Sequence, residues 1–129
     1  MTTHTDFQPI AGGAALSDTA AQPYDHRWLV VDEHDRWLGA DQAPGLAGLA
    51  LSLRFGYLVI RAEGMLRLDI PLDVIEDDDS VERTAQIGQQ AVRVVDEGEL
   101  AGAWFSEWLG QPCRLVKVHP DAGQIAWPT

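Results

Sequence analysis

The chain has 129 residues, of which 46% are hydrophobic, so it is long enough to bury one core and gives no indication of a second domain. Twenty acidic residues against nine basic ones give a net charge of −11, which would repel nucleic acid and anionic membrane surfaces. We therefore expect a single domain over residues 1–129 that has neither a nucleic-acid partner nor a membrane partner.

The sequence shows no export signal and no membrane span. No basic stretch precedes an apolar run at the N-terminus, and nowhere do eighteen apolar residues stand together. The cytoplasm is therefore the expected location. Cys113 is the only cysteine, which excludes an internal disulfide and a zinc site made of several thiolates. We expect its thiol to be a small packed hydrophobe.

Short strands separated by turns are predicted for the first part of the chain. Residues 28–32 are β-branched and aromatic, and a polar turn over 32–35 leads to residues 36–38, which predicts a hairpin. Three further segments alternate apolar with small or polar residues, as half-buried strands do. Their apolar members are Leu49, Leu51 and Leu53, then Leu58 and Ile60, then Leu66, Leu68 and Ile70. Gly56 and Gly64 fall where the chain has to turn.

One helix is predicted near the C-terminus. Asp96 and Glu99 have the spacing of a capping box, and Gly110 followed by Pro112 provides a stop. An apolar stripe lies between these signals and needs a partner, so we expect the helix to plug or cover the sheet. The stripe consists of Leu100, Ala101, Trp104, Phe105, Trp108 and Leu109.

One strand is predicted on each side of this helix. Val92 and Val94 alternate with polar residues before it, and residues 115–118 follow it. Lys117, the only lysine, is expected on a solvated face of that last strand. Together the elements predict a mainly β fold, a small β-barrel of short antiparallel or mixed strands with one amphipathic helix near the C-terminus.

Few residues have the spacing that catalysis or metal binding requires. The histidines, which are His4, His26, His34 and His119, show no metal-ligand spacing. The acidic run at 76–79 lacks the glycine and the distal glutamate of a calcium loop, so we expect a solvated loop. Gly12 and Gly13 indicate a turn, because no Walker-type lysine follows. We predict no catalytic residue, no metal site and no cofactor.

Several short motifs, in order along most of the chain, support a resemblance. They are Pro9 and Ile10; Asp25 with Trp28 to Asp32; Arg36 to Leu38; Pro44 and Leu46; Asp96 and Gly98; Ala103, Trp104, Ser106, Leu109 and Gly110; Arg114 and Leu115. On these residues the chain resembles the N-terminal β-barrel domain that precedes the MOSC (molybdenum cofactor sulfurase C-terminal) domain in cofactor sulfurases and amidoxime-reducing proteins. The resemblance implies that such a barrel helps to hold the phosphate of molybdopterin, while the reactive cysteine belongs to the MOSC domain. We expect no MOSC domain within residues 1–129.

The chain departs from the family at the positions that the resemblance assigns to phosphate binding. Ala11 and Gly12 stand where the family has a lysine and then a serine or glycine. Gly39 and Asp41 correspond to its threonine and arginine after the hairpin. Each lost charge-assisted donor forfeits about 1.5 to 3 kcal/mol. The resemblance therefore implies weak phosphate binding here.

His26 is a further departure, because it follows Asp25 where the family has an arginine. Arg27 comes one position later, on the opposite face of a regular strand. The candidate ligand-binding residues are therefore Asp25, His26, Arg27 and Asp41.

Three functions follow from these residues. The leading hypothesis is a stand-alone, non-catalytic barrel that binds a small molecule or a protein partner. The alternative is an accessory domain that acts with a separate MOSC domain in molybdenum cofactor or sulfur handling. An unrelated enzyme built on His26 with Asp25 or Asp41 is disfavoured, because neighbours in a strand point to opposite faces.

Overall fold

Two antiparallel sheets and one helix make up the computed structural model, which describes residues 6–72 and 82–127. The four-stranded sheet, in the order β1-β7-β6-β5, consists of β1 (Trp28–Asp32), β7 (Cys113–Val118), β6 (Gln90–Asp96) and β5 (Glu82–Ile87). The three-stranded sheet consists of β2 (Ala50–Arg54), β3 (Tyr57–Arg61) and β4 (Leu68–Pro71). The helices are η1 (Thr19–Tyr24) and η2 (Pro44–Gly48), both 3-10, and α1 (Glu99–Leu109). The predicted acidic loop at 76–79 and His4 lie outside the described residues.

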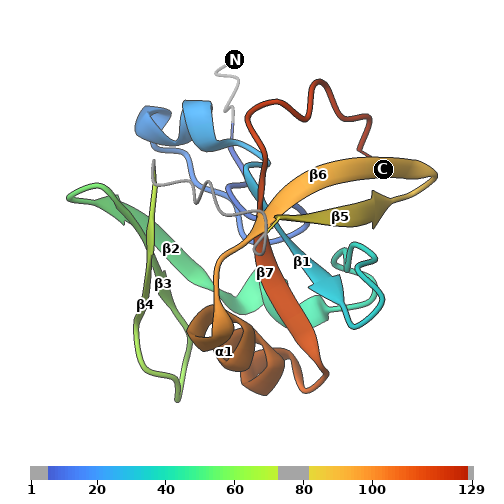
Figure 1. Cartoon of the computed structure of the whole chain (residues 1–129). Coiled ribbons are helices and arrows are strands. Elements are labelled where there is room, and N and C mark those ends of the chain that lie inside the picture. Colours follow the sequence, from blue (N-terminus) through green and yellow to red (C-terminus); the bar gives the residue numbers. More distant parts are fainter. Residues whose placement is uncertain (1–5, 73–81, 128–129) are drawn as a thin grey trace.

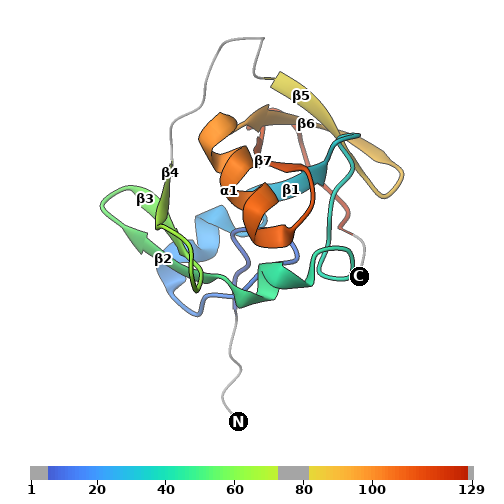
Figure 2. The same ribbon diagram turned by 90° about the horizontal axis from the view of Figure 1, so that it is seen from below.

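The sheets stand on opposite sides of α1 and form a half-barrel around it (Figures 1 and 2). Every strand pair in the two sheets is antiparallel. Parallel pairing occurs in the described part of the chain only as isolated bridges, Ile10 with Trp28 and Arg36 with Gln86. The predicted fold class is confirmed: the molecule is mainly β, with one helix near the C-terminus.

The three-stranded sheet follows the predicted alternation. Leu51, Leu58, Ile60, Leu68 and Ile70 are buried on its inner face. Both connecting turns contain a glycine with positive φ, as the turn signals predicted. The one exception is Leu66, which is exposed and precedes β4.

Helix α1 fills the half-barrel as predicted. Two predictions about its first turn were wrong: that Asp96 caps it and that Leu100 is buried. Trp104 and Phe105 are buried in the core, whereas Leu100 is 76% exposed. The N-cap residue is Gly98, without a side-chain cap. Asp96 ends β6 instead, and its carboxylate accepts a hydrogen bond from the Gly98 N–H at 2.8 Å. The predicted stop is confirmed, because Gly110 adopts a left-handed conformation and caps the helix.

The four-stranded sheet is covered on both faces, which explains why the first four residues of β1 are all apolar. Trp28 and Val30 face α1 and the main core. Leu29 and Val31 face a second cluster, against which Trp127 near the end of the chain packs. Residues 119–127 thus complete a core that no strand pattern indicated. No helix in the described part of the chain is long and apolar enough to cross a membrane.

The predicted hairpin after β1 is only partly formed. Leu38 N donates to Val30 O at 2.8 Å, but the preceding residue, Trp37, donates its N–H to Gln86 O of β5 at 2.9 Å. The segment 36–38 therefore divides its backbone hydrogen bonds between β1 and β5, and pairs through isolated bridges instead of a strand.

Lys117 is buried, at 1% exposure, so the prediction of a solvated lysine was wrong. Its Nζ donates to the carbonyl of Leu72 at 2.6 Å and of Pro71 at 3.3 Å, and lies 5.2 Å from the ring centroid of Trp28. Carbonyl acceptors and an aromatic face compensate the desolvated ammonium. Lys117 thereby connects β7 to the end of β4.

Candidate functional site

The segment just before β1 carries three of the four predicted site residues. Asp25 caps the end of η1, and His26 has a φ of 55°, which is a left-handed conformation. The N–H of His26 donates to Gln8 O at 2.7 Å, which fixes the turn against the N-terminal part of the chain. Because β1 begins only at Trp28, strand alternation does not separate Asp25, His26 and Arg27.

Asp25 and His26 are in direct contact. The Asp25 Oδ1 lies 3.0 Å from Nδ1 of His26 and also accepts the N–H of Gln8 at 2.7 Å. A carboxylate only accepts, so the contact places a proton on Nδ1 and leaves Nε2 facing away from Asp25. The expectation that these side chains lie on opposite faces was wrong, because both precede the strand.

These residues line a cavity of about 290 Å³ at the end of the four-stranded sheet, here called the His26 hollow. Its lining includes Asp25, His26, Arg27, His119, Ile125 and Trp127. The rings of His26 and Trp127 have centroids 5.1 Å apart. None of its described lining residues is a serine, threonine or cysteine, so the Asp25–His26 pair has no hydroxyl or thiol nucleophile beside it in the described part of the chain.

His119 adds a second imidazole to the same cavity. Its Nδ1 accepts the N–H of Asp121 at 3.0 Å, which places the proton of the neutral ring on Nε2. The Asp121 carboxylate, at 3.9 Å from the same nitrogen, is too far for a hydrogen bond. His119 is thus held as an acceptor toward its own loop.

Asp41 lies in a neighbouring cavity of about 460 Å³, here called the Gly12 hollow. The hollow is lined by Gly12, Trp37, Gly39, Ala40, Asp41, Gln42 and Gly88. A Cβ added at Gly12 would lie 3.2 Å from Ala40 N, so two backbone segments approach closely here. The structure therefore separates Asp41 from the other three candidates.

Three aromatic rings connect the two hollows. Trp127 stands between His26 and Trp37, and its ring centroid is 5.2 Å from that of Trp37 in an edge-to-face arrangement. Trp37 is held in place by its indole N–H, which donates to the carbonyl of Ala11 at 3.2 Å. Trp37, His119 and Trp127 are the site residues that sequence reasoning missed. The sequence offered one signal for them: the segment before the C-terminus has no strand pattern but contains two large apolar residues, Ile125 and Trp127.

The lining does not fit the phosphate of a molybdenum cofactor. Of the positions that the resemblance assigns to phosphate binding, Gly12, Gly39 and Asp41 share one hollow, His26 lines the other, and the buried Ala11 lines neither. The Gly12 hollow has a carboxylate and neither lysine nor arginine among its described lining residues. Arg27 lines only the His26 hollow, together with Asp25. In each hollow a phosphate would therefore lie near a carboxylate, whereas its binding requires hydrogen-bond donors.

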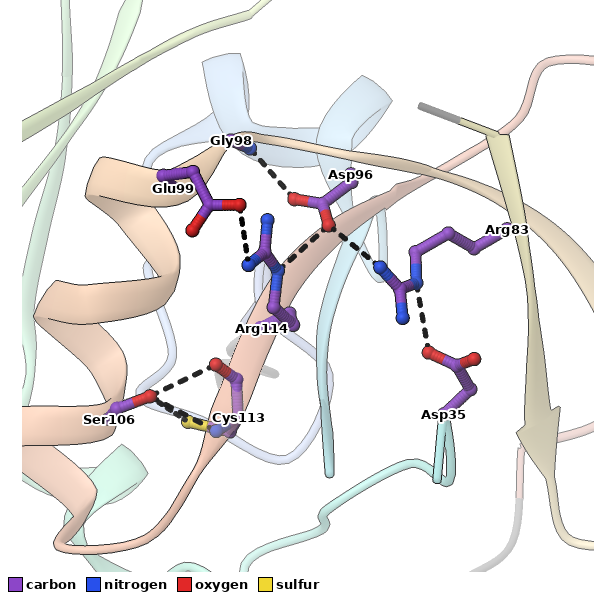
Figure 3. Close-up of polar contacts among 8 residues, drawn as sticks. All are labelled: Asp35, Arg83, Asp96, Gly98, Glu99, Ser106, Cys113 and Arg114. Atoms are coloured by element: carbon purple, nitrogen blue, oxygen red, sulfur yellow. Dashed lines mark hydrogen bonds and ion pairs between the residues drawn. The ribbon is translucent and has the colours of Figure 1, made fainter. Parts of the chain in front are cut away.

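The remaining charged cluster is structural (Figure 3). Asp96 accepts from Arg114 Nε at 2.8 Å and from Arg83 Nη1 at 3.3 Å, while Glu99 pairs with Arg114 at 3.1 Å. The hydrogen bond from Arg114 to Asp96 is the main reason that the pKa of Arg114 is raised. This cluster joins β5, β6, β7 and the start of α1, and both oxygens of the buried Asp96 carboxylate accept hydrogen bonds within it.

Cys113 is packed, as predicted. Its side chain is buried and its backbone N–H and carbonyl both bond to Ser106 Oγ, at 3.1 and 3.0 Å. Burial raises the pKa of the thiol, although the hydrogen bond with Ser106 acts in the other direction. In the described ranges, no three histidine, cysteine or acidic side chains stand close enough to hold a metal ion.

Comparison with known proteins identifies relatives over most of the chain. The family model of the MOSC N-terminal beta barrel domain matches residues 11–112. The molybdenum cofactor sulfurases of Danio rerio and Homo sapiens are 33% identical over 101 residues and 31% identical over 105 residues. These matches cover 76% and 80% of this chain, but the chain spans only 12% of the length of either relative.

A solved structure matches almost the whole chain. The solution structure of a Bordetella bronchiseptica protein is 53% identical, with a TM-score of 0.83, and the match covers 99% of this chain and 98% of that one. Trp127, which joins the two hollows, lies beyond the residues that the family model matches.

Proposed function

Since the chain belongs to the MOSC N-terminal β-barrel domain family, we propose that it is a non-catalytic binding module whose ligand occupies the His26 and Gly12 hollows. The ligand is a small molecule with a planar part and a neutral or cationic polar group. One observation carries this proposal: four of the positions that the resemblance assigns to phosphate binding line these two hollows and present Gly12, Gly39 and Asp41 in one and His26 in the other.

The chemistry of the lining supports this ligand class. Trp37 and Trp127 offer ring faces and edges at the junction of the hollows. Asp25 and Asp41 supply one carboxylate to each hollow. A planar cation is attracted both to the carboxylates and to the indole rings, whereas a phosphate gains neither interaction.

Two probes that share a ring and differ in charge test the proposal. Tyramine joins a cationic ammonium to a planar ring and phenyl phosphate joins an anionic phosphate to one, and each is titrated into isotope-labelled protein while amide and indole N–H resonances are followed. We expect tyramine to shift the resonances of His26 and of the Trp127 indole. Trp127→Ala should abolish this response, whereas Leu100→Ala, an exposed position on α1, should preserve it. Tighter binding of phenyl phosphate contradicts the proposal.

A protein partner for the same site is tested in parallel by a pull-down with the wild-type chain as bait. If neither neutral nor cationic probes cause a response and no partner is retained, the proposal of a binding module is contradicted.

The relatives favour a second candidate. The curated matches are named molybdenum cofactor sulfurase, and this chain spans a small part of them. The domain would then assist cofactor or sulfur handling together with a separate MOSC domain. Mixing the chain with a separately produced MOSC domain and molybdopterin tests this: co-elution or retained cofactor supports it, and independent elution without cofactor opposes it.

A further inference from the structure

One side of the three-stranded sheet faces away from α1 (Figure 2), and the side chains on this outer side form a second surface. Its residues alternate with the buried leucines and isoleucines of the core and line one shallow hollow of about 380 Å³. We call it the arginine face, and it consists of Arg54, Phe55, Tyr57, Val59, Arg61, Arg67 and Asp69.

The arginine face is positive on a chain whose net charge is −11. Elsewhere Arg83, Arg93 and Arg114 each pair with a carboxylate. On this face Arg67 pairs with Asp69 at 3.1 Å, while Arg54 and Arg61 have no carboxylate partner among the described residues. Within the described part of the chain, these two guanidinium groups are thus open to the carboxylates of an acidic partner.

Phe55 gives independent evidence that the face has a use. Its side chain is 96% exposed, and its φ of 51° is left-handed. Together with Gly56 it forms the two-residue turn between β2 and β3, where asparagine and glycine are the unstrained choices and a bulky residue is costly. A strained, exposed aromatic side chain beside arginines has the composition of a binding hot spot.

The geometry of the sheet sets the shape of the ligand. Arg54 is opposite Tyr57 at one end of β3, and Arg61 lies four residues further along that strand, so the two positive ends are about 13 Å apart. Val59 lies between them, with only 5% exposure, as an apolar floor. A small anion reaches only one end. An extended peptide with carboxylates four residues apart reaches both.

We propose that the arginine face binds an extended acidic segment of a partner protein. Carboxylates of the segment pair with Arg54 at one end and with Arg61 at the other, and an apolar side chain lies over Val59 between these two ends. The proposal is independent of the His26 and Gly12 hollows, because it uses the other sheet.

A fluorescein-labelled peptide that repeats glutamate, serine, valine, serine is the probe, because in an extended strand its glutamates four residues apart and the valine between them lie on one face. Fluorescence anisotropy is the measurement. We expect binding that weakens as salt rises from about 50 to about 300 mM. Arg61→Glu should weaken binding by about tenfold or more, because it places like charges together. Arg36→Glu, the same charge change at an exposed residue beside the other sheet, should change it by less than about twofold.

A second variant separates binding from folding. Phe55→Asn relieves the strained turn and should raise the midpoint of thermal unfolding while it weakens peptide binding. Equal weakening by Arg61→Glu and Arg36→Glu would overturn the proposal, since only net charge would matter. Complete displacement of the peptide by inorganic phosphate, or binding only between copies of this chain, would overturn it as well.

Discussion

The ionisation of Glu97 is linked to the stability of the fold. Burial raises its pKa above 4.5, although the Trp28 indole N–H, at 2.7 Å, and the charge of Lys117 favour the carboxylate. A carboxyl group with a raised pKa binds its proton more tightly in the folded state. Its contribution is therefore full below about pH 4.5 and is lost as the pH rises through the folded-state pKa.

Glu97→Gln removes this titration and keeps an oxygen that accepts the Trp28 indole N–H. We expect the free energy of unfolding of the wild type to fall, relative to the variant, between acidic pH and pH of about 8. Urea unfolding at several pH values measures this difference. The exposed Glu107→Gln serves as the control, and a difference for Glu97→Gln that does not depend on pH would contradict the explanation.

The buried environment of Lys117 predicts how its substitution changes the stability of the protein. Lys117→Ala leaves the carbonyls of Pro71 and Leu72 without their donor and opens a void, so we expect a loss of about 2–4 kcal/mol in the free energy of unfolding. Lys117→Met refills the volume without restoring the donor and should lose less. Chemical denaturation of both variants measures the order. An alanine variant as stable as the wild type would show that Lys117 does not hold β7 to the end of β4.

At the scale of elements, Asp96 connects the sheet to the start of α1 (Figure 3). Asp96→Ala leaves Arg83 and Arg114 without their shared carboxylate and frees the N–H of Gly98. Removal of one partner from a buried ion pair costs about 3–5 kcal/mol, and we expect a loss at the lower end of that range because Arg83 retains Asp35.

Thermal and chemical unfolding measure this loss. Glu99→Gln is the matched control, since the Glu99 carboxylate is exposed and its pair with Arg114 is worth less than about 1 kcal/mol. Similar effects of the two substitutions would show that Asp96 does not organise the cluster.

The elements could be predicted wherever apolar residues recur along one face of a strand or helix. Alternation found β2, β3 and β4, and the stripe with Gly110 found α1. Strand β5 was missed because its buried residues, Ala85 and Ile87, come only at its end. The capping box was wrong because Asp96 belongs to β6, where two arginines that are distant in sequence bind it.

At the scale of the molecule, the site required tertiary structure. The residues just before β1 could be proposed from the family resemblance, which named Asp25, His26, Arg27 and Asp41. The division of these four residues between two hollows could not be predicted from the sequence. It depends on Trp127, which comes from the far end of the chain and lies between His26 and Trp37. Periodicity describes strands and helices, and residues 119–127 have neither.

The double variant His26→Arg, Asp41→Arg tests the central claim, that these hollows have exchanged phosphate binding for a neutral or cationic ligand. Calorimetric titration of phenyl phosphate and tyramine into wild type and variant measures the preference. Each added guanidinium is worth about 1.5 to 3 kcal/mol to a phosphate. Glu63→Arg, a charge reversal at an exposed turn, is the control. The account predicts that the wild type prefers tyramine and that the double variant, but not the control, prefers phenyl phosphate. A wild type that already prefers phenyl phosphate would contradict it.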